Sequence, residues 1–278
     1  MRVFVTGGSS PLGELVLPRL SANHEVWALA RSDVAVERVE HRGSLAVHGT
    51  LEDATTWVEN LQRADAVVHL AGMRFVDAVV GHVGTHQPLT VIGSASVRNP
   101  AHPRSGEFLA IEARLMRSKP IGLVVLRPTM IYGSSGDRNI RLLARVLATL
   151  PAIPHFIGGC VIQPVLADDV ADAVAKTLGT TERIDADIGG PVPVQLGEIV
   201  AELARLLNKR VAPIPVPVPA LALLSEVLYQ LRPSRGIHAL AMLRHDRDVV
   251  PAGNEILGHA PTPLDEGLAL AMSRYQSE

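Results

Sequence analysis

The clearest chemical feature of the chain is a glycine-rich run, TGGSSPLG at Thr6–Gly13, directly behind the apolar segment RVFV at Arg2–Val5. These residue types predict a short buried strand, a tight turn and a helix that begins near Leu12. Gly7 would allow the tight turn, and Gly13 would allow close packing of the helix on the strand. The free N–H groups and the dipole of a helix N-terminus favour an anion. The sequence therefore predicts a phosphate site at this turn, of the kind that holds the pyrophosphate of a dinucleotide.

Ser10 departs from the usual spacing of glycines in such a turn. In a TGxxGxxG pattern the middle glycine would stand at this position. The serine hydroxyl could donate a hydrogen bond to a phosphate, whereas its Cβ narrows the space for the backbone to approach. Both effects are expected at Ser10.

The composition excludes several classes of protein. A net charge of −2 gives no large basic surface for nucleic acid. No uninterrupted apolar run approaches the roughly 20 residues that span a bilayer, and Arg2 leads straight into a strand without a signal peptide. The single Cys160 leaves neither an internal disulfide nor a Cys-rich metal site. We therefore expect a soluble, cytoplasmic protein without a metal site, a nucleic-acid partner or a membrane span.

Apolar runs of strand length alternate with segments of helical periodicity. The predicted strands are Arg2–Val5, Glu25–Ala30, Leu45–His48, Ala66–Leu70, Leu89–Gly93 and Gly122–Leu126. The predicted helices are Leu12–Leu20, Glu52–Leu61, Arg74–His82, Gly106–Arg117, Asn139–Leu150, Ala167–Leu178, Gln195–Leu207, Ala220–Leu231 and Pro263–Ser273. This alternation is typical of an α/β fold with a doubly wound parallel sheet, of the Rossmann type.

Two domains are expected from this pattern. Residues 1–180 would form the dinucleotide-binding domain, and residues 181–278 a small, mostly helical lobe at the carboxyl edge of the sheet. Parts of residues 127–180 would also line the pocket between them. The apolar segment Ala220–Leu231 could pack in the lobe, line a lipophilic pocket or form a homodimer contact.

Six segments in order along the chain carry a family resemblance. They are TGGSSPLG at Thr6–Gly13, HGTLED at His48–Asp53, DAVVHLAG at Asp65–Gly72, TVIGSASV at Thr90–Val97, LRPTMIYG at Leu126–Gly133 and QPVLADDVADAV at Gln163–Val174. Together they resemble the short-chain dehydrogenase/reductase superfamily, and its extended and atypical NAD-dependent epimerase/dehydratase branch most closely. The tail of the chain is similar to the substrate lobe of that branch only loosely.

The resemblance implies a set of cofactor-binding residues. They are Thr6, Gly7, Ser9, Ser10, Pro11, Leu12, Gly13, Arg31, Ser32, Thr50, Leu51, Leu70, Ala71, Gly72, Arg127 and Pro128. Relatives carry an Asp that meets the adenine where this chain has Thr50 before Leu51, so that contact is expected to be weakened or supplied by another residue.

The end of the second strand distinguishes NADP from NAD. A carboxylate there accepts hydrogen bonds from the ribose 2′-OH, whereas an arginine pairs with a 2′-phosphate. Arg31 and Ser32 occupy this position, and Asp33 lies just beyond it. This order favours NADP, while Asp33 leaves NAD as the alternative.

The catalytic pair that the resemblance implies is missing. The superfamily uses a Tyr-x-x-x-Lys pair with a serine, in which the lysine lowers the pKa of the tyrosine. Ser94 matches the serine, with Ser96 as a neighbour that could replace it. None of the three tyrosines has a lysine four residues later. Alignment through Glu112 instead places Arg104 and Phe108 at the positions of the pair, and a shift by one turn places Phe108 and Glu112 there.

Two functions remain open. In the first, the chain is an oxidoreductase or epimerase/dehydratase-like enzyme acting on a small carbonyl or hydroxyl compound. Ser94 would polarise the carbonyl and Tyr132 would supply the proton, with the titratable His69 and His86 as weaker candidates. In the second, the chain binds the nucleotide without turnover, as a redox sensor or assembly subunit.

Acidic residues near the end of the predicted pocket suggest a structural role rather than a metal site. Asp168 is expected to cap the helix that begins there, and Asp169 stands in its first turn.

Overall fold

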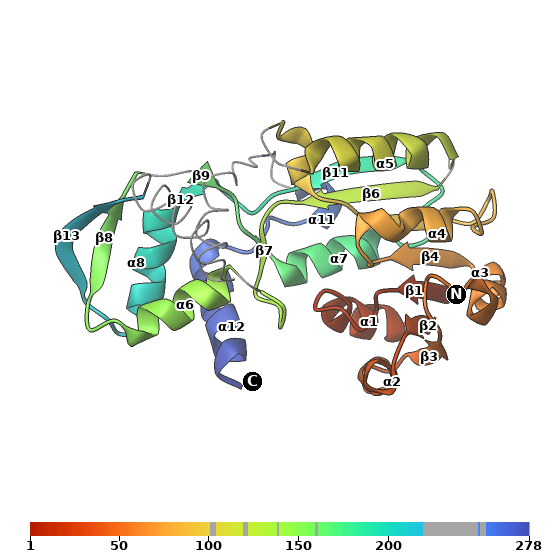
Figure 1. The fold of residues 1–278 in the computed structure, drawn as a ribbon, viewed down its shortest axis with the longest axis horizontal. Coiled ribbons are helices and arrows are strands. Elements are labelled where there is room, and N and C mark those ends of the chain that lie inside the picture. Colours follow the sequence, from red (N-terminus) through yellow and green to blue (C-terminus); the bar gives the residue numbers. More distant parts are fainter. Residues whose placement is uncertain are drawn as a thin grey trace.

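The central element is a parallel sheet whose carboxyl edge faces a smaller lobe (Figure 1). The computed structural model describes residues 1–100, 104–118, 122–137, 139–158, 161–218, 250 and 254–277. The sheet has seven strands in the order β11-β6-β5-β4-β1-β2-β3. Their bounds are β1 Arg2–Thr6, β2 Glu25–Ala30, β3 Leu45–His48, β4 Ala66–His69, β5 Leu89–Ile92, β6 Leu123–Pro128 and β11 Ile184–Ile188. The doubly wound α/β fold is confirmed.

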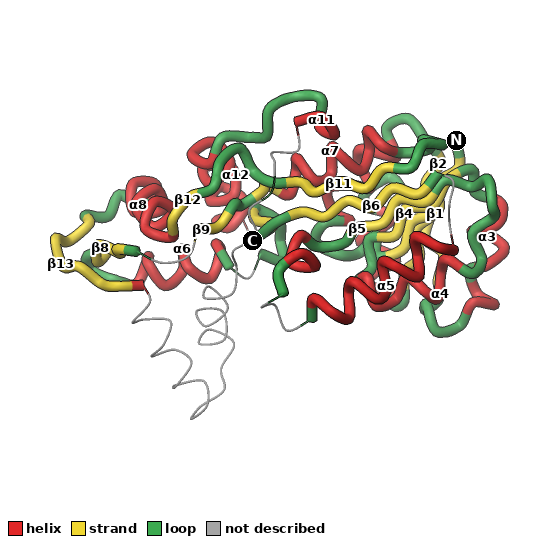
Figure 2. The backbone as a smooth tube through the Cα atoms, turned by 90° about the horizontal axis from the view of Figure 1, so that it is seen from above, coloured by secondary structure: helices red, strands yellow, loops and turns green. Residues whose placement is uncertain are grey.

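Each face of the sheet has its own hydrophobic core, because successive side chains of a strand point to opposite faces. On β1, Val3 and Val5 join one core, and Phe4 joins the other. Helices α1 (Gly13–Ser21), α2 (Asp33–Glu40) and α7 (Ala167–Thr177) contribute to the first core, while α3 (Val58–Arg63), α4 (Val76–Val80) and α5 (Ser105–Ser118) contribute to the second. Figure 2 shows α4 and α5 on one side of the sheet and α7 on the other.

The lobe is built on a third core. In the described residues its helices are α6 (Ile140–Thr149), α8 (Leu196–Leu206) and α12 (Leu264–Ser277), and a further short helix, α11 (Asn254–Leu257), packs on α7. Three pairs of short strands complete it: β7 (Ile131–Tyr132) with β10 (Val165–Leu166), β9 (Val161–Ile162) with β12 (Val194–Gln195), and β8 (Ile153–Ile157) with β13 (Val211–Pro217).

The sheet and the lobe exchange segments of the chain. Strand β11 lies beyond residue 180, where the sequence predicts the first domain to end, yet it pairs with β6 as the edge of the main sheet. Conversely, α6 and β8 precede residue 180 and belong to the core of the lobe. The segment Ala220–Leu231, with its expected homodimer contact, lies outside the described residues. Within the described residues, no helix is long and apolar enough to cross a membrane.

The proline-rich segment before residue 219 forms a strand. β13 tolerates its prolines because it pairs with a single neighbour, β8, and its register shifts between Ala212 and Pro215. A four-residue 3₁₀ turn, Ala95–Arg98, follows β5 and presents Ser94 at the carboxyl edge.

Candidate functional site

A cavity of about 410 Å³ opens at the carboxyl edge of the sheet. It lies where β1 is flanked by β4 on one side and β2 on the other, the point at which the strand order reverses and at which open α/β sheets bind ligands. Its lining comes from the ends of β1, β2, β3 and β4: Gly7, Ser9, Ser10, Pro11, Leu29, Arg31, Gly49, Thr50, Leu51, Glu52, Ala71, Gly72 and Phe75. The structure thus brings together most of the residues that the sequence predicts for a cofactor.

The glycine turn requires two of its glycines. Gly7 has a φ of +75°, and a Cβ at this position would lie 2.5 Å from the backbone nitrogen of Ala71. A Cβ at Gly13 would overlap the carbonyl group of Gly8. Hence the turn after β1 and the turn after β4 touch through their backbones, and the two form one continuous wall of the cavity.

Ser10 takes part in the start of α1. Its Oγ accepts a hydrogen bond from the backbone N–H of Gly13 at 3.1 Å, and its own N–H donates to the carbonyl of Gly7 at 2.9 Å. The hydroxyl that replaces a glycine therefore caps one of the free N–H groups of the helix. Because the oxygen accepts this bond, its hydrogen remains able to point to an anion.

The end of β2 presents a cation to the cavity. Arg31 lines the cavity, whereas neither Ser32 nor Asp33 does. The Ser32 hydroxyl accepts a hydrogen bond from the N–H of Ala35 at 3.4 Å and so caps α2. The Asp33 carboxylate is fully exposed, with His48 Nε2 4.0 Å away.

The third strand contributes Thr50 and Leu51 through a loop held by a tryptophan. The indole N–H of the fully buried Trp57 donates to the carbonyl of Thr50 at 2.8 Å. Leu51 faces the cavity together with Leu29 and Phe75, two residues that the sequence analysis did not select. These three apolar side chains suit a flat, weakly polar group such as a base.

The other residues predicted around the turn are buried beneath it. The hydroxyl of Thr6 lies 2.7 Å from Nδ1 of His69, so both side chains are occupied within the sheet, and Leu70 donates its N–H to the carbonyl of Thr6 at 2.9 Å. Burial lowers the pKa of His69 to about 4, opposed in part by a hydrogen bond with the Gly72 backbone. His69 is therefore neutral and structural near neutral pH. Leu12 packs partly buried against the first core.

Ser94 stands at the end of β5 with a second hydroxyl beside it. Its Oγ lies 2.6 Å from Oγ of the buried Ser96, and either oxygen could be the donor. The turn that carries both serines is tied to β11, because Arg98 donates to Asp187 at 2.6 Å. Ser94 is half-buried, so its hydroxyl can reach a ligand.

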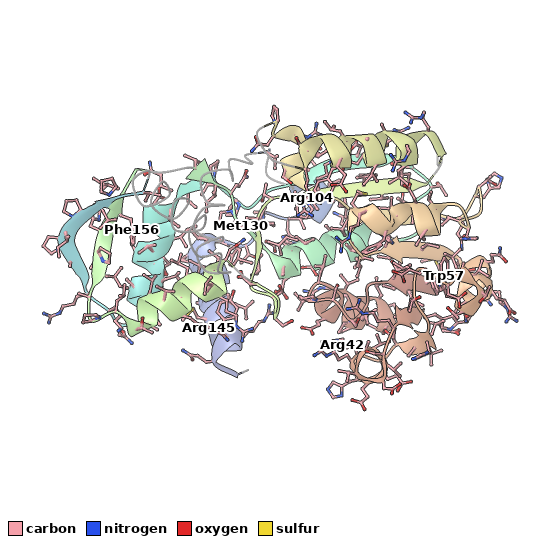
Figure 3. The ribbon with its side chains drawn as sticks, in the orientation of Figure 1. Arg42, Trp57, Arg104, Met130, Arg145 and Phe156 are labelled. Atoms are coloured by element: carbon pink, nitrogen blue, oxygen red, sulfur yellow. The ribbon has the colours of Figure 1, made fainter. Side chains whose placement is uncertain are left out.

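Arg104 and Phe108, which one of the two alignments sets at the positions of the Tyr-x-x-x-Lys pair, lie against each other. Arg104, labelled in Figure 3, immediately precedes α5. Its guanidinium carbon is 5.3 Å from the centre of the Phe108 ring. Helix α5 packs on the turn that follows Ser94. Neither side chain can transfer a proton near neutral pH, since an arginine stays charged and a phenylalanine has no acidic hydrogen.

Arg127 serves a buried ion-pair network. Its guanidinium binds both oxygens of Glu112, at 2.8 and 3.0 Å, and also binds Asp185. The two groups of the Arg127–Glu112 pair are almost fully buried. Although burial alone would lower the pKa of Arg127, the hydrogen bonds that it donates to these carboxylates raise its pKa above the ordinary value. Arg127 and its neighbour Pro128, at the end of β6, do not line the cavity, and the pair instead fixes α5 against β6.

Tyr132 lies in the core of the lobe rather than in the cavity. It is 1% exposed, and Gly267 of α12 is packed so closely against its hydroxyl that no Cβ would fit there. Burial, and then the carboxylates of Asp169, Asp137 and Asp265, raise the pKa of Tyr132 above its ordinary value. This environment is the opposite of what a proton donor near neutral pH needs.

Two further expectations concern titratable side chains. His86 is in the loop before β5, which enters the sheet at its amino edge, and it is therefore at the end of the strands opposite the cavity. The expectation that Asp168 caps its helix is wrong: Leu166 is the capping residue, without a side-chain bond, and Asp168 pairs with Arg19 and Arg274. Arg19 and Arg274 attract the Asp168 carboxylate more strongly than do the uncharged N–H groups at the N-terminus of α7.

Comparison with known proteins agrees with this geometry. Residues 3–84 match the NAD dependent epimerase/dehydratase family. A 4-hydroxy-2-methyl-3-oxo-4-farnesyl-3,4-dihydroquinoline-1-oxide ketoreductase of Stigmatella aurantiaca is 30% identical over 182 residues, which are 62% of this chain and 52% of that protein. The chain thus spans about half the length of this relative.

Solved structures share the whole fold. The triphenylmethane reductase of Citrobacter sp. superposes with a TM-score of 0.77 at 18% identity, over 98% of this chain and all of that one (100%). The NADPH-dependent quinone oxidoreductase of Escherichia coli, solved with NADPH, superposes with a TM-score of 0.74 at 16% identity, over 96% of this chain and 98% of that one. At these identities the likeness concerns the fold.

Proposed function

We propose that the chain is a member of the short-chain dehydrogenase/reductase superfamily, in its NAD-dependent epimerase/dehydratase branch, and that it is an NADP(H)-dependent oxidoreductase of a small carbonyl or hydroxyl compound. The observation that carries the proposal is the 410 Å³ cavity at the strand-order reversal, walled by a turn in which Gly7 leaves no space for a side chain. A turn without side chains lets its backbone N–H groups come close to a ligand, as a pyrophosphate site requires.

The residues present fit a dinucleotide. Backbone N–H groups at the start of α1 and the Ser10 hydroxyl would hold the pyrophosphate. Leu29, Leu51 and Phe75 would cover the adenine, which supplies the contact that Thr50 lacks. The Arg127 side chain is left out of this set, since Glu112 and Asp185 occupy it.

Replacing Arg31 by alanine is expected to weaken NADPH binding much more than NADH binding. Arg31 is the cation at the end of β2 that faces the cavity. A charge-assisted hydrogen bond is worth about 1.5–3 kcal/mol, which corresponds to roughly a 10- to 100-fold loss for NADPH. Fluorescence titration with both nucleotides would measure the loss.

Arg63→Ala is the matched control, because Arg63 is an exposed arginine of α3 that pairs with the exposed Glu59 at 3.2 Å and does not line the cavity. It should change neither affinity. An equal loss of NADPH and NADH affinity in the Arg31 variant would contradict the assignment of a 2′-phosphate to Arg31.

The chain's own contribution to the chemistry is orientation of the acceptor. Bound NADP(H) would supply or accept the hydride. The hydroxyl of Ser94 would donate a hydrogen bond to the carbonyl oxygen of the substrate as negative charge develops there, and it would accept one from the hydroxyl of Ser96. Since Arg104 and Phe108 cannot transfer a proton and Tyr132 lies in the lobe core, the proton that balances reduction would come from water.

This arrangement suits an acceptor that tolerates delayed protonation. A conjugated carbonyl such as a quinone spreads the negative charge that follows hydride addition, and it takes up its proton afterwards. The known activities of fold neighbours, a quinone oxidoreductase and a triphenylmethane reductase, support this class of acceptor.

The test is NADPH oxidation, followed by absorbance, with quinones and conjugated ketones. Ser94→Ala should lower kcat roughly 10- to 100-fold and leave the NADPH affinity unchanged, because Ser94 is outside the cavity that would hold the adenosine. Ser21→Ala is the control: Ser21 forms a similar pair with Ser44, 2.9 Å apart, at the far end of α1. Equal turnover by the Ser94 variant and the unaltered chain would contradict the role of Ser94.

A second candidate function has one observation in its favour. Glu112, the acid of α5 whose carboxylate lies near Gly93, is bound by Arg127 and so offers no free acid beside Ser94, while Arg104 and Phe108 lie against each other. A protein that binds NADP(H) without turnover, as a redox sensor or assembly subunit, would need no such acid. Tight NADPH binding without oxidation by any acceptor would favour this candidate. A cytoplasmic location and a homodimer remain predictions.

A further inference from the structure

The loop between β7 and α6, Gly133–Asp137, is bound to the C-terminal helix α12. The hydroxyl of Tyr275 donates to Oδ2 of Asp137 at 2.5 Å and accepts the N–H of Gly133 at 3.2 Å. Arg274 Nη1 donates to the carbonyl of Gly133 at 3.0 Å. Two consecutive residues of α12 thus hold both ends of this loop.

The other side of the same loop touches the glycine turn. The Ser135 hydroxyl donates to Oε2 of Glu14, in the first turn of α1. Gly136 lies so close to Pro11 that a Cβ there would overlap the proline ring. Pro11 is part of the lining of the cofactor cavity. The Gly133–Asp137 loop therefore connects the glycine turn and α1, near the N-terminus, with α12, near the C-terminus.

Polar contacts hold the loop on the side where it is not packed against Pro11. Between the loop, α1 and α12 lies a void of about 280 Å³, lined by residues that include Pro11, Glu14, Ser135 and Arg274. Glu14 is held from the opposite side by Arg42, at 3.0 Å, and Figure 3 shows Arg42 between α1 and α2. A loop next to a void can shift when its hydrogen bonds are removed, and Pro11 would shift with it.

A carboxylate of α7 fixes the helix that holds the loop. Asp168 accepts from Arg274 at 2.7 Å and from Arg19 of α1 at 3.0 Å. Burial alone would raise the pKa of Asp168, but the two arginines lower it below its ordinary value. Helix α12 is thereby set against α1 and α7, the helices that flank the glycine turn.

We propose that Tyr275 and Arg274 are positioning residues for the cofactor site, which act by holding the Gly133–Asp137 loop against Pro11 and Glu14. The inference rests on the proposed binding of NADP(H) in the cavity. A turn already fixed in its binding conformation loses less conformational freedom when the ligand arrives. Each loop residue left to order on binding would otherwise weaken the affinity.

The experiment is an NADPH titration of the full chain carrying Tyr275→Phe. The variant keeps the ring and loses the hydrogen bonds to Asp137 and Gly133. We expect the Kd for NADPH to rise about 3- to 30-fold, mostly through faster dissociation. Lys209→Met is the matched control, because it also removes two lobe hydrogen bonds, to the carbonyls of Ala148 and Leu150, but none in the loop. It should lower Tm and leave the Kd unchanged.

Ser135→Ala acts on the same loop from the side of α1, and it provides a second test if the tyrosine variant folds poorly. The two substitutions together should raise the Kd by less than the product of their separate effects, because both free the same loop. If the unaltered chain binds NADPH and Tyr275→Phe binds it equally well, the positioning role is wrong while the proposed function stands. If the unaltered chain binds neither NADPH nor NADH, the proposed function fails and the inference with it.

Discussion

Gly7→Ala is expected to abolish NADPH binding at concentrations that saturate the unaltered chain. Gly7 has a φ of +75°, a conformation that alanine adopts only with strain, and its Cβ would stand 2.5 Å from the nitrogen of Ala71. To relieve the overlap, the turn after β1 must separate from the turn after β4, and both are walls of the cavity. The strain alone is worth about 1–3 kcal/mol, or roughly a 5- to 150-fold change, before the loss of phosphate contacts is counted.

Gly81→Ala is the control for this substitution. Gly81 follows α4 with a φ of −65°, and a Cβ there would meet nothing within 4 Å. The control should bind NADPH as the unaltered chain does. Normal NADPH affinity in a folded Gly7 variant would show that the nucleotide binds elsewhere.

Arg127→Met is expected to cause the largest loss of stability, about 3–5 kcal/mol in the free energy of unfolding. The substitution leaves Glu112 without its partner, and the carboxyl of Glu112 is buried with the guanidinium that it binds at 2.8 Å. Such a loss would lower Tm by roughly 10 °C in a chain of this length. Urea unfolding would measure the change in free energy.

The control for the buried pair is Arg114→Met. Arg114 pairs with Asp77 at 2.7 Å, but both side chains are half exposed, so the expected loss is below about 1 kcal/mol. Adding Glu112→Leu to Arg127→Met should recover part of the stability, because the buried carboxylate of Glu112 is then removed as well, while Asp185 is half exposed. Equal losses for the exposed and the buried pair would contradict this account.

Much of the sheet could be predicted because its strands are continuous apolar runs. The apolar residues of RVFV and AVVH are buried on both faces of the sheet, and such a strand can be recognised from its own residues without information on the strands beside it. The glycine turn could be predicted from its motif, although only the contact of Gly13 with Gly8 is local, whereas Gly7 is needed for the contact with Ala71 after β4.

Other elements depend on their surroundings and were not predicted. β11 has the sequence IDADI, whose two aspartates are tolerated because Arg127 and Arg98 meet them. β13 contains several prolines and is a strand only because β8 pairs with it. The start of α2 can be recognised in the sequence from Ser32, which caps the helix, whereas the family resemblance places Ser32 at the cofactor.

The site shows the same limit at the level of side chains. A motif places a residue near a cleft, but it does not tell which way the side chain points. Arg127 and Tyr132 follow the family pattern in sequence, yet one binds Glu112 and the other lies in the lobe core. Leu29 and Phe75 line the cavity, but no motif includes them. Apolar residues in strands and short helices are usually part of the hydrophobic core, so their sequence does not mark them as binding residues.

The most direct test of the account is a fluorescence titration of the purified chain with NADPH and, separately, with NADH. The cavity at the strand-order reversal and Arg31 at its edge predict saturable binding of NADPH, with NADH bound more weakly. Binding of neither nucleotide would contradict the account: the glycine turn would then be a remnant of the fold, with Ser10 closing the helix end that a phosphate should occupy.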